Sequence, residues 1–246
     1  MNASQSTQGG GAPRRVAVIT GASVGIGAAI AARFVADGAQ VYGLARRPCP
    51  VAGAIAVEAD LSDISAITAL IERLKGELAE PVELHLVHNA AVMPQDSVVD
   101  LDADEVERAL RINLVAPMLL TAGLRPRMAA GSSIIYIGST LSEKAVPGRA
   151  TYVASKHAIV GLMRSTTQDL FGAGIHTACV CPGFTDTEML RPVLDADPAL
   201  RDAVLKMVSF GRLLDPKEIA DVVAFAAATP AINGAVIHAN LGQRES

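Results

Sequence analysis

Three side chains between residues 139 and 156 have the chemistry needed to move a proton. Ser139 carries a hydroxyl, Tyr152 a phenol and Lys156 an ammonium group, and Tyr152 and Lys156 are four residues apart. In a helix that starts at about residue 151 they lie one turn apart on the same face. Free tyrosine titrates at about pH 10, so acid and base chemistry near neutral pH needs a positive charge that stabilises the phenolate. Because this spacing also occurs on ordinary helix surfaces, its meaning depends on the surrounding elements.

The elements around this stretch would place the three side chains beside a ligand. The apolar run at 133–137 predicts a buried strand that ends just before Ser139, and residues 151–171 have helical spacing. Ligands of open parallel sheets bind outside the carboxyl ends of the strands. We therefore expect Ser139, Tyr152 and Lys156 to border one crevice.

A glycine-rich turn at 20–27, with the sequence T-G-A-S-V-G-I-G, predicts the other side of that crevice. It joins an apolar run at 16–19 to an alanine-rich helix that extends to about residue 37. Gly21 permits a tight turn, Gly25 lets a pyrophosphate approach the helix N-terminus, and Gly27 lets helix and strand pack closely. The free N–H groups of the helix would bind the phosphates. A plain glycine-rich turn is the alternative, but the strand before it and the helix after it favour a dinucleotide site.

Two arginines, Arg46 and Arg47, follow the second predicted strand at 40–45. A site for NAD usually carries an acidic residue here for the ribose 2′-hydroxyl, whereas an arginine can bind a 2′-phosphate through two hydrogen bonds. We therefore predict NADP as the cofactor, with NAD less favoured. Arg46 is the main candidate for the phosphate, and Arg47 and Ser23 are weaker ones. The alternative is that both arginines are solvated at the strand end.

The composition is that of a single α/β domain. The chain has 246 residues, of which 50% are hydrophobic and only 3% aromatic, and its net charge is -4. We expect a mobile tail at 1–13, one domain at 14–246, and no general affinity for nucleic acid or membrane. No apolar run is long enough to span a bilayer. The three cysteines suit reduced thiols in a cytoplasmic protein, and we interpret Cys179 and Cys181 as buried strand residues rather than metal ligands.

Strand and helix patterns alternate along the rest of the chain. Further strands are predicted at 54–58, 84–87, 176–181 and 235–238, and helices at 63–79, 102–128 and 215–228. This alternation favours a parallel sheet with helices on both faces. The connection at 47–53 is too short for a crossover helix, so we expect a loop there. Pro117 is expected to interrupt the long helical region.

Two segments have open interpretations. Asp60 either contacts the adenine or caps the helix that follows it, and Ser62 competes for the cap. A substrate loop is expected at about 184–211, in which residues 188–210 form either a mobile lid or a surface helical hairpin. A lone His88 is interpreted as structural. Apolar loop residues suggest a substrate pocket: Met93, Pro94, Val146, Pro147, Phe184, Met189 and Leu190.

With these motifs in this order, the chain resembles the short-chain dehydrogenase/reductase family over about 14–242. Residues 20–27 match the family's cofactor loop, Asp60 its adenine aspartate, and Pro182, Gly183 and Thr187 the segment that holds the nicotinamide carboxamide. The resemblance implies a Rossmann-type, doubly wound sheet of seven mainly parallel strands and a homotetramer or homodimer. The cofactor-binding residues expected from the motifs and the resemblance are Gly21, Ser23, Gly25, Ile26, Gly27, Arg46, Arg47, Asp60, Leu61, Asn89, Tyr152, Lys156, Pro182, Gly183, Thr185 and Thr187.

The same resemblance implies a catalytic tetrad of Asn113, Ser139, Tyr152 and Lys156. The implied reaction transfers a hydride between NADP(H) and a ketone, an aldehyde or a secondary alcohol. Tyr152 would exchange a proton with the substrate oxygen, Ser139 would hold that oxygen, and Lys156 would assist Tyr152 and bind the nicotinamide ribose. Asn113 would hold a water in the proton relay.

The chain departs from the family pattern in two places. The usual N-N-A-G after the fourth strand is replaced at 88–91 by H-N-A-A, in which Ala91 adds a methyl beside the cofactor path. The family's D-G-G becomes N-L-G at 240–242, which puts subunit packing there in doubt. Two other functions stay open: a non-catalytic NADP-binding regulator and an epimerase- or dehydratase-like relative.

Overall fold

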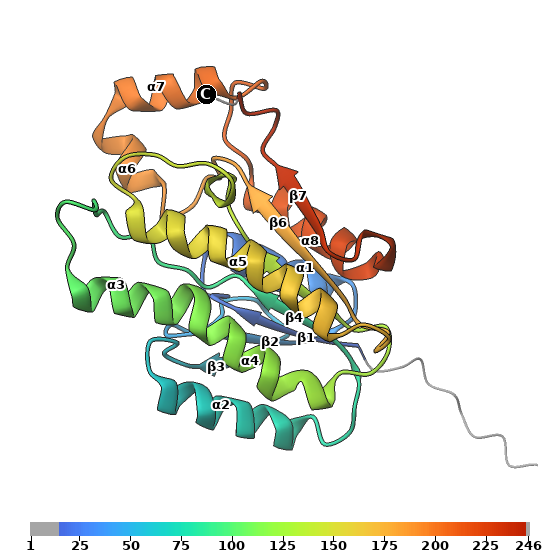
Figure 1. Ribbon diagram of the computed structural model, residues 1–246. Helices are drawn as coiled ribbons and strands as arrows, with labels where there is room; N and C mark the ends of the chain where they lie inside the picture. Colours follow the sequence, from blue (N-terminus) through green and yellow to red (C-terminus); the bar gives the residue numbers. More distant parts are fainter. Residues whose placement is uncertain (1–14, 245–246) are drawn as a thin grey trace, which may run out of the picture.

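Seven parallel strands form the centre of the computed structural model, which describes residues 15–244 (Figure 1). Their order in the sheet is β3-β2-β1-β4-β5-β6-β7, and every neighbouring pair is parallel. The winding reverses between β1 and β4, so the predicted doubly wound sheet is confirmed. The tail expected at 1–13 lies outside the described residues. The strands are β1 (Arg15–Thr20), β2 (Gln40–Ala45), β3 (Ala54–Glu58), β4 (Glu83–His88), β5 (Ser133–Ile137), β6 (His176–Pro182) and β7 (Ala235–Ala239).

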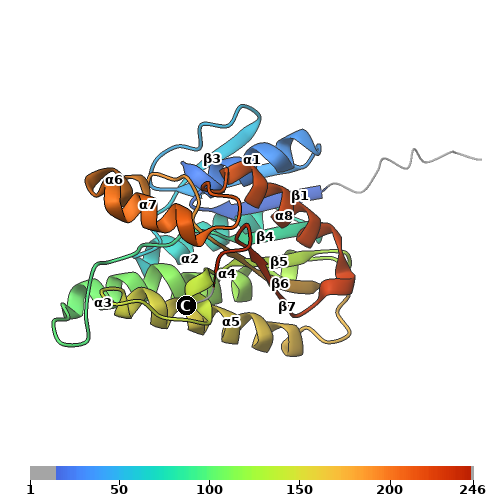
Figure 2. The same ribbon diagram turned by 90° about the horizontal axis from the view of Figure 1, so that it is seen from above.

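Helices cover both faces of this sheet. Figure 2 shows α1 and α8 on one side and α3, α4 and α5 on the other, where α2 also packs against α4. The α-helices are α1 (Gly25–Ala36), α2 (Ile64–Glu77), α3 (Ala103–Leu110), α4 (Ala116–Leu124), α5 (Ala150–Asp169), α6 (Arg191–Ala196), α7 (Pro198–Met207) and α8 (Pro216–Ala228). The shorter turns are η1 (Arg111–Val115), η2 (Arg125–Arg127), η3 (Thr140–Ser142) and η4 (Pro230–Ile232).

Burial on both faces explains the continuous apolar runs of the central strands. Along β1, Val16 and Val18 belong to the core under α2, α4 and α5, whereas Ala17 and Ile19 belong to the core under α1 and α8. Successive side chains of a strand point to opposite faces, so each core receives every second residue.

The helical region at 102–128 is interrupted, but the prediction that Pro117 breaks it was wrong. The break is the π-helical turn η1, and Pro117 sits in the first turn of α4 after it. Proline is tolerated in a first turn because it does not clash with a preceding turn of the same α-helix. Because Pro117 has no N–H, it cannot donate a hydrogen bond to the carbonyl of Asn113, four residues earlier.

The N-cap of α2 is neither Asp60 nor Ser62, the two candidates that the sequence suggested. Asp63 is the N-cap, and its side chain accepts a hydrogen bond from the Ser65 N–H at 2.8 Å. Asp60 and Ser62 bind each other instead, since Asp60 Oδ1 accepts from the Ser62 N–H at 2.9 Å and from its hydroxyl at 2.7 Å. This local turn orients Asp60 independently of the helix.

The connections at 46–53 and 184–211 differ in structure. Residues 46–53 between β2 and β3 form a loop, as expected from their length. Residues 184–211, which we call the lid, contain the short helices α6 and α7 at one end of the sheet (Figures 1 and 2). Within residues 15–244, no helix has the length and apolar character needed to cross a membrane.

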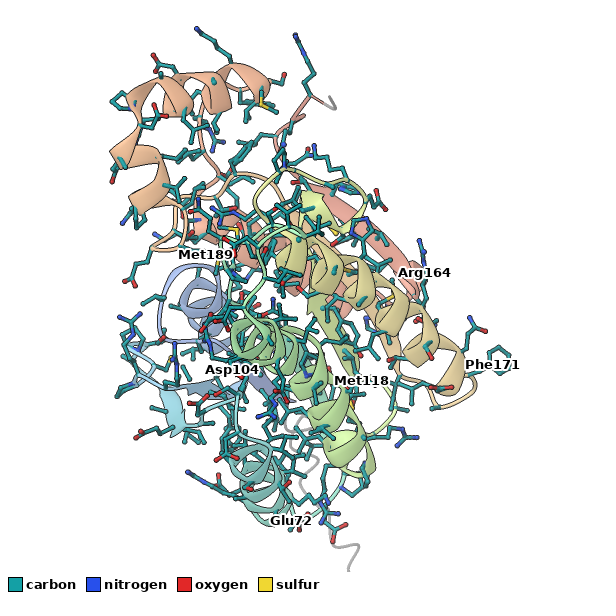
Figure 3. The ribbon with its side chains drawn as sticks, turned by 60° about the vertical axis from the view of Figure 1, so that its left-hand side comes forward. Glu72, Asp104, Met118, Arg164, Phe171 and Met189 are labelled. Atoms are coloured by element: carbon teal, nitrogen blue, oxygen red, sulfur yellow. The ribbon has the colours of Figure 1, made fainter. Side chains whose placement is uncertain are left out.

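Two large apolar side chains are exposed on the layer that contains α4 and α5. Met118 on α4 is 48% exposed, and Phe171, just after α5, is 92% exposed and projects from the molecule (Figure 3). Exposed apolar side chains of this size suit a contact between subunits. The homo-oligomer expected from the sequence stays a prediction.

Candidate active site

A cavity of about 1000 Å³ lies at the carboxyl ends of the strands. The glycine-rich turn, the ends of β2, β4, β5 and β6, the start of α5 and the lid all contribute to its wall. Every predicted catalytic or cofactor-binding residue lines this cavity except Asn113, which in the described chain lies behind its wall. The fold thus brings the two motifs, which are more than 100 residues apart, to one crevice.

Lys156 and Tyr152 face each other inside the wall of the cavity. Lys156 is 3% exposed and Tyr152 8%, and the Lys156 Nζ lies 5.5 Å from the centroid of the Tyr152 ring. The same Nζ donates a hydrogen bond of 2.7 Å to the carbonyl oxygen of Ile137 at the end of β5. An ammonium group has three N–H donors, so two of them stay available toward the cavity.

Ser139 is oriented by the short turn that it begins. Its Oγ accepts a hydrogen bond of 3.1 Å from the Leu141 N–H, while its own N–H donates to Ser142 Oγ at 3.1 Å. Because Oγ acts as an acceptor in this capping interaction, its hydroxyl proton is left to donate to a ligand. Ser139 is therefore held in place as a hydrogen-bond donor.

The start of α5 is fixed by a residue from another part of the chain. Asp96, in the loop after β4, accepts from the Thr151 N–H through its side chain at 3.2 Å and from the Ala150 N–H through its backbone at 3.4 Å. The local N-cap residue, Arg149, makes no side-chain cap and instead donates to the Pro94 carbonyl at 3.2 Å. This long-range cap sets the first turn of α5, which carries Tyr152.

Asn113 acts between elements rather than in the cavity wall. Its Oδ1 accepts from the Val92 N–H at 2.8 Å, and its Nδ2 donates to the Val92 carbonyl at 2.9 Å and to Ser155 Oγ at 3.0 Å. Ser155 in turn donates to the Tyr152 carbonyl at 2.8 Å. The Asn113 side chain thus joins the π-helical turn, the loop after β4 and α5 behind the Tyr152 and Lys156 pair.

The glycine-rich turn requires its glycines for close packing and for its backbone conformation, and Asn89, just after β4, braces it. A Cβ on Gly27 would overlap the Gly21 carbonyl oxygen, and one on Gly25 would lie 3.3 Å from a methyl of Thr187. Gly21 and Gly25 have φ values of 69° and 55°, which favour glycine. Asn89 Nδ2 donates to the Thr20 carbonyl at 2.9 Å. Gly21, Gly25 and Gly27 line the cavity at the start of α1, where a pyrophosphate would bind.

Charged side chains line the cavity beside the ends of β2 and β3. The pKa of the Asp60 carboxyl is held below its usual value, mainly by the N–H and hydroxyl of Ser62 and to a smaller extent by the charge of Arg46. Arg47 Nη2 lies 3.0 Å from Glu188 Oε2 of the lid. Of the two predicted arginines, Arg46 is therefore the better placed to bind an anion, because Arg47 already has a carboxylate partner.

The lid supplies most of the apolar wall at the other end. Met93, Val146, Phe184, Met189 and Leu190 line the cavity as predicted, but among the described residues Pro94 and Pro147 do not. The Pro94 carbonyl binds Arg149 instead. The expected substrate loop supplies further apolar lining residues from α6 and α7, namely Val193, Leu194, Leu200, Val204 and Met207. Sequence reasoning missed Gln243, which follows β7 and also lines the cavity.

Cys179, Cys181 and His88, among the described residues, do not line the cavity. Cys179 and Cys181 are fully buried on β6 as expected, their Sγ atoms are 3.8 Å apart, and the neighbouring thiol and burial raise the pKa of Cys179. Among residues 15–244, no three His, Cys, Asp or Glu side chains are grouped as in a metal site. His88 is buried against the Tyr136 ring, and its Nε2 lies 2.9 Å from Thr121 Oγ1.

The chain is similar to known proteins over most of its length. Residues 21–244 match the family model described as Enoyl-(Acyl carrier protein) reductase. The 3-oxoacyl-[acyl-carrier-protein] reductase FabG of Salmonella typhimurium is 32% identical over 240 residues, which cover 93% of this chain and 96% of the relative. The cyclic-di-GMP-binding biofilm dispersal mediator protein of Escherichia coli is 34% identical over 224 residues, which cover 87% of this chain and 89% of the relative.

A solved structure also resembles this chain in fold and sequence. The 3-oxoacyl (acyl-carrier-protein) reductase of Agrobacterium tumefaciens, solved with NADP bound, has a TM-score of 0.83 and 29% identity, with 93% of each chain covered. A doubly wound parallel sheet with a glycine-rich turn and a Ser, Tyr and Lys group at one cavity defines a Rossmann-type oxidoreductase. The chain belongs to the short-chain dehydrogenase/reductase family.

Proposed function

We propose that this protein is an NADPH-dependent reductase of 3-oxoacyl thioesters. The observation that carries the proposal is that Ser139, Tyr152 and Lys156 line the same cavity as the glycine-rich turn, next to an apolar lid. The names of the FabG relative and of the Agrobacterium structure support a 3-oxoacyl substrate. An apolar wall suits the hydrocarbon part of an acyl chain.

The cavity fits NADP at both ends of the cofactor. The glycine-rich turn and the start of α1 line the cavity where the pyrophosphate would bind, and Arg46 would bind the 2′-phosphate. Pro182, Gly183, Thr185 and Thr187 line the cavity where the nicotinamide would lie. When bound, NADPH supplies the hydride.

The residues of the chain supply the proton and hold the reacting oxygen. Tyr152 donates its phenolic proton to the 3-keto oxygen as that oxygen becomes a hydroxyl. Ser139 donates a hydrogen bond to the same oxygen, which its capped geometry leaves it free to do. Of the two remaining Lys156 N–H groups, one would stabilise the Tyr152 phenolate and the other would bind a ribose hydroxyl.

Asn113 would contribute through its backbone. Its side chain is occupied by Val92 and Ser155. Its carbonyl lacks the usual helical donor because residue 117 is proline, so this carbonyl could hold the water of a proton relay. The same side chain acts as a positioning group, because it ties α5 in place behind Tyr152.

The Tyr152→Phe variant tests the assignment. With acetoacetyl thioester and NADPH, we expect kcat to fall by roughly 10²- to 10⁴-fold, because the proton donor is removed. The affinity for NADPH, measured by NADPH fluorescence, should stay the same, since the phenyl ring at residue 152 remains. If the variant turns over as fast as the native protein, Tyr152 is not the acid.

A binding protein without catalysis is the second candidate. It is favoured by the likeness to the Escherichia coli mediator protein, whose name records binding of cyclic-di-GMP. Calorimetry with cyclic-di-GMP, beside NADPH oxidation with a panel of 3-oxoacyl thioesters, separates the two. Dinucleotide binding without turnover of any thioester would favour the regulator.

A further inference from the structure

Gln243 is a buried polar side chain at the lid end of the cavity. It lines the cavity, is 7% exposed, and its Oε1 has no hydrogen-bond partner within the described part of the chain. Buried polar atoms in folded proteins nearly always have a partner. An unpaired acceptor in the wall of a binding cavity therefore points to a donor on the ligand.

The backbone fixes Gln243 to the end of the lid. Residue 243 forms an antiparallel bridge with Val208, just after α7, and the Arg244 N–H donates to the Met207 carbonyl at 2.7 Å. The segment after β7 thus reaches α7, as Figure 1 shows. On its other side, Oε1 lies 3.2 Å from the position that a Cβ on Gly183 would occupy. Gln243 therefore stands between the lid and the end of β6.

A strained turn brings Gln243 to this position. Leu241 has a φ of 52°, a left-handed conformation that is uncommon for a residue with a side chain. The Asn240 side chain accepts from the Gly242 N–H at 3.1 Å, and the Asn240 carbonyl accepts from the Gln243 N–H at 3.1 Å. Backbone strain of this kind persists where surrounding contacts enforce it and is frequent at binding sites. This turn replaces the glycine-rich D-G-G of the family.

The lid wall beside Gln243 offers no other amide. The described lining residues from 189 to 207 are all apolar: Met189, Leu190, Val193, Leu194, Leu200, Val204 and Met207. In an apolar pocket, a single polar group fixes the orientation of the ligand. Gln243 can accept a hydrogen bond through Oε1 and donate through Nε2, which matches both halves of a secondary amide.

We propose that Gln243 binds an amide group in the thiol part of the substrate. The inference rests on the proposed function, because a 3-oxoacyl chain has carbonyl acceptors but no N–H or O–H of its own. In a thioester of a 3-oxo acid, an N–H or O–H donor must therefore belong to the thiol part of the molecule, which we call the thiol arm. Gln243 then marks the path of this arm between the lid and β6 and makes the enzyme selective for thioesters with an amide-containing arm.

The test compares two ligands that differ at the amide. They are the N-acetylcysteamine thioester of a 3-oxo acid and its S-alkyl thioester of equal length, in which the amide is replaced by methylenes. Each is titrated by calorimetry into the native protein saturated with NADP⁺, a combination that cannot react. We expect the amide ligand to bind roughly fivefold to tenfold more tightly, as for one net hydrogen bond.

In Gln243→Met, the ratio of the two affinities should fall to about one, because methionine has a similar length but no amide. Met207→Leu, a neighbouring change that leaves the amide pair intact, should preserve it. An unchanged ratio in Gln243→Met would overturn the inference while leaving the proposed function intact. So would a loss of NADP⁺ affinity in Gln243→Met with the ligand ratio preserved, because the contact would then be to the cofactor. If the native protein binds neither thioester, the 3-oxoacyl assignment fails and the inference fails with it.

Discussion

At the scale of residues, the proposed chemistry depends on the hydrogen-bonding capacity that the fold leaves unused. Ser139 accepts a bond from the turn that it begins, so its hydroxyl proton is available to a ligand. Lys156 gives one donor to the Ile137 carbonyl and keeps two. Arg47 is paired with Glu188, whereas Arg46 lines the cavity close enough to Asp60 to lower the pKa of its carboxyl. These differences assign separate roles to side chains that look equivalent in the sequence.

Replacement of Arg46 tests the choice of cofactor. In Arg46→Ala we expect the KM for NADPH to rise roughly 10- to 100-fold, as for the loss of a charge-assisted hydrogen bond, and the KM for NADH to change little. Arg47→Ala is the matched control, with a smaller effect because Arg47 binds Glu188. If the native protein prefers NADH, the assignment of Arg46 to a 2′-phosphate is wrong.

At the scale of elements, the site is held by contacts between segments that are far apart in the chain. Asp96 caps α5 from the loop after β4, Asn113 joins that loop to α5, and Asn89 braces the glycine-rich turn. All three lie in or contact the segment that follows β4. This segment therefore couples the cofactor end of the cavity to the proposed catalytic end.

The glycine-rich turn should not tolerate a methyl group at Gly27. The added Cβ would overlap the Gly21 carbonyl, so we expect Gly27→Ala to lower the free energy of unfolding by about 1–3 kcal/mol and to weaken NADPH binding more than tenfold. Urea unfolding and NADPH fluorescence measure the two effects.

Gly161→Ala is the control for that change. Gly161 lies in α5, and none of the described residues has an atom within 4 Å of its Cβ position apart from its chain neighbours and helix backbone. Alanine in a helix should therefore stabilise the protein by about 0.5–1 kcal/mol. Equal effects of the two alanines would contradict the packing argument.

At the scale of the whole molecule, two buried histidines make stability depend on pH. Burial lowers the pKa of His85 to about 4 and that of His88 to about 3. Both side chains are therefore neutral in the folded protein at neutral pH. Unfolding exposes them to water, where histidine titrates near about pH 6.5.

The sign of the effect follows from proton binding. Below about pH 6.5 the unfolded chain binds more protons than the folded one, so the free energy of unfolding falls as the pH decreases toward 4. Each histidine contributes at most about 1.4 kcal/mol per pH unit. Urea unfolding of the native protein and of His88→Gln between pH 7 and 5 measures this slope. A slope that His88→Gln does not reduce would contradict the assignment.

Much of the fold was predictable because local patterns and global topology agree. Strands buried on both faces appear as continuous apolar runs such as 16–19, and the glycine-rich turn marks where β1 meets α1. The break in the helical region was misplaced, because Pro117 is tolerated in a first turn and the sequence carries no signal for a π-helical turn. The cap of α2 was misassigned because Asp60 and Ser62 satisfy each other.

The sequence by itself determined the alternation of strands and helices and the position of the glycine-rich turn, because these follow from apolar periodicity and from glycine spacing. The resemblance to the family implied the seven-stranded sheet and the candidate tetrad. Only the tertiary structure decided how each side chain is used. The cap of α5 by Asp96, the removal of Asn113 from the cavity wall and the placement of Gln243 beneath the lid all join residues that are distant in the chain. Such contacts depend on packing and chain return in three dimensions, which no local pattern encodes.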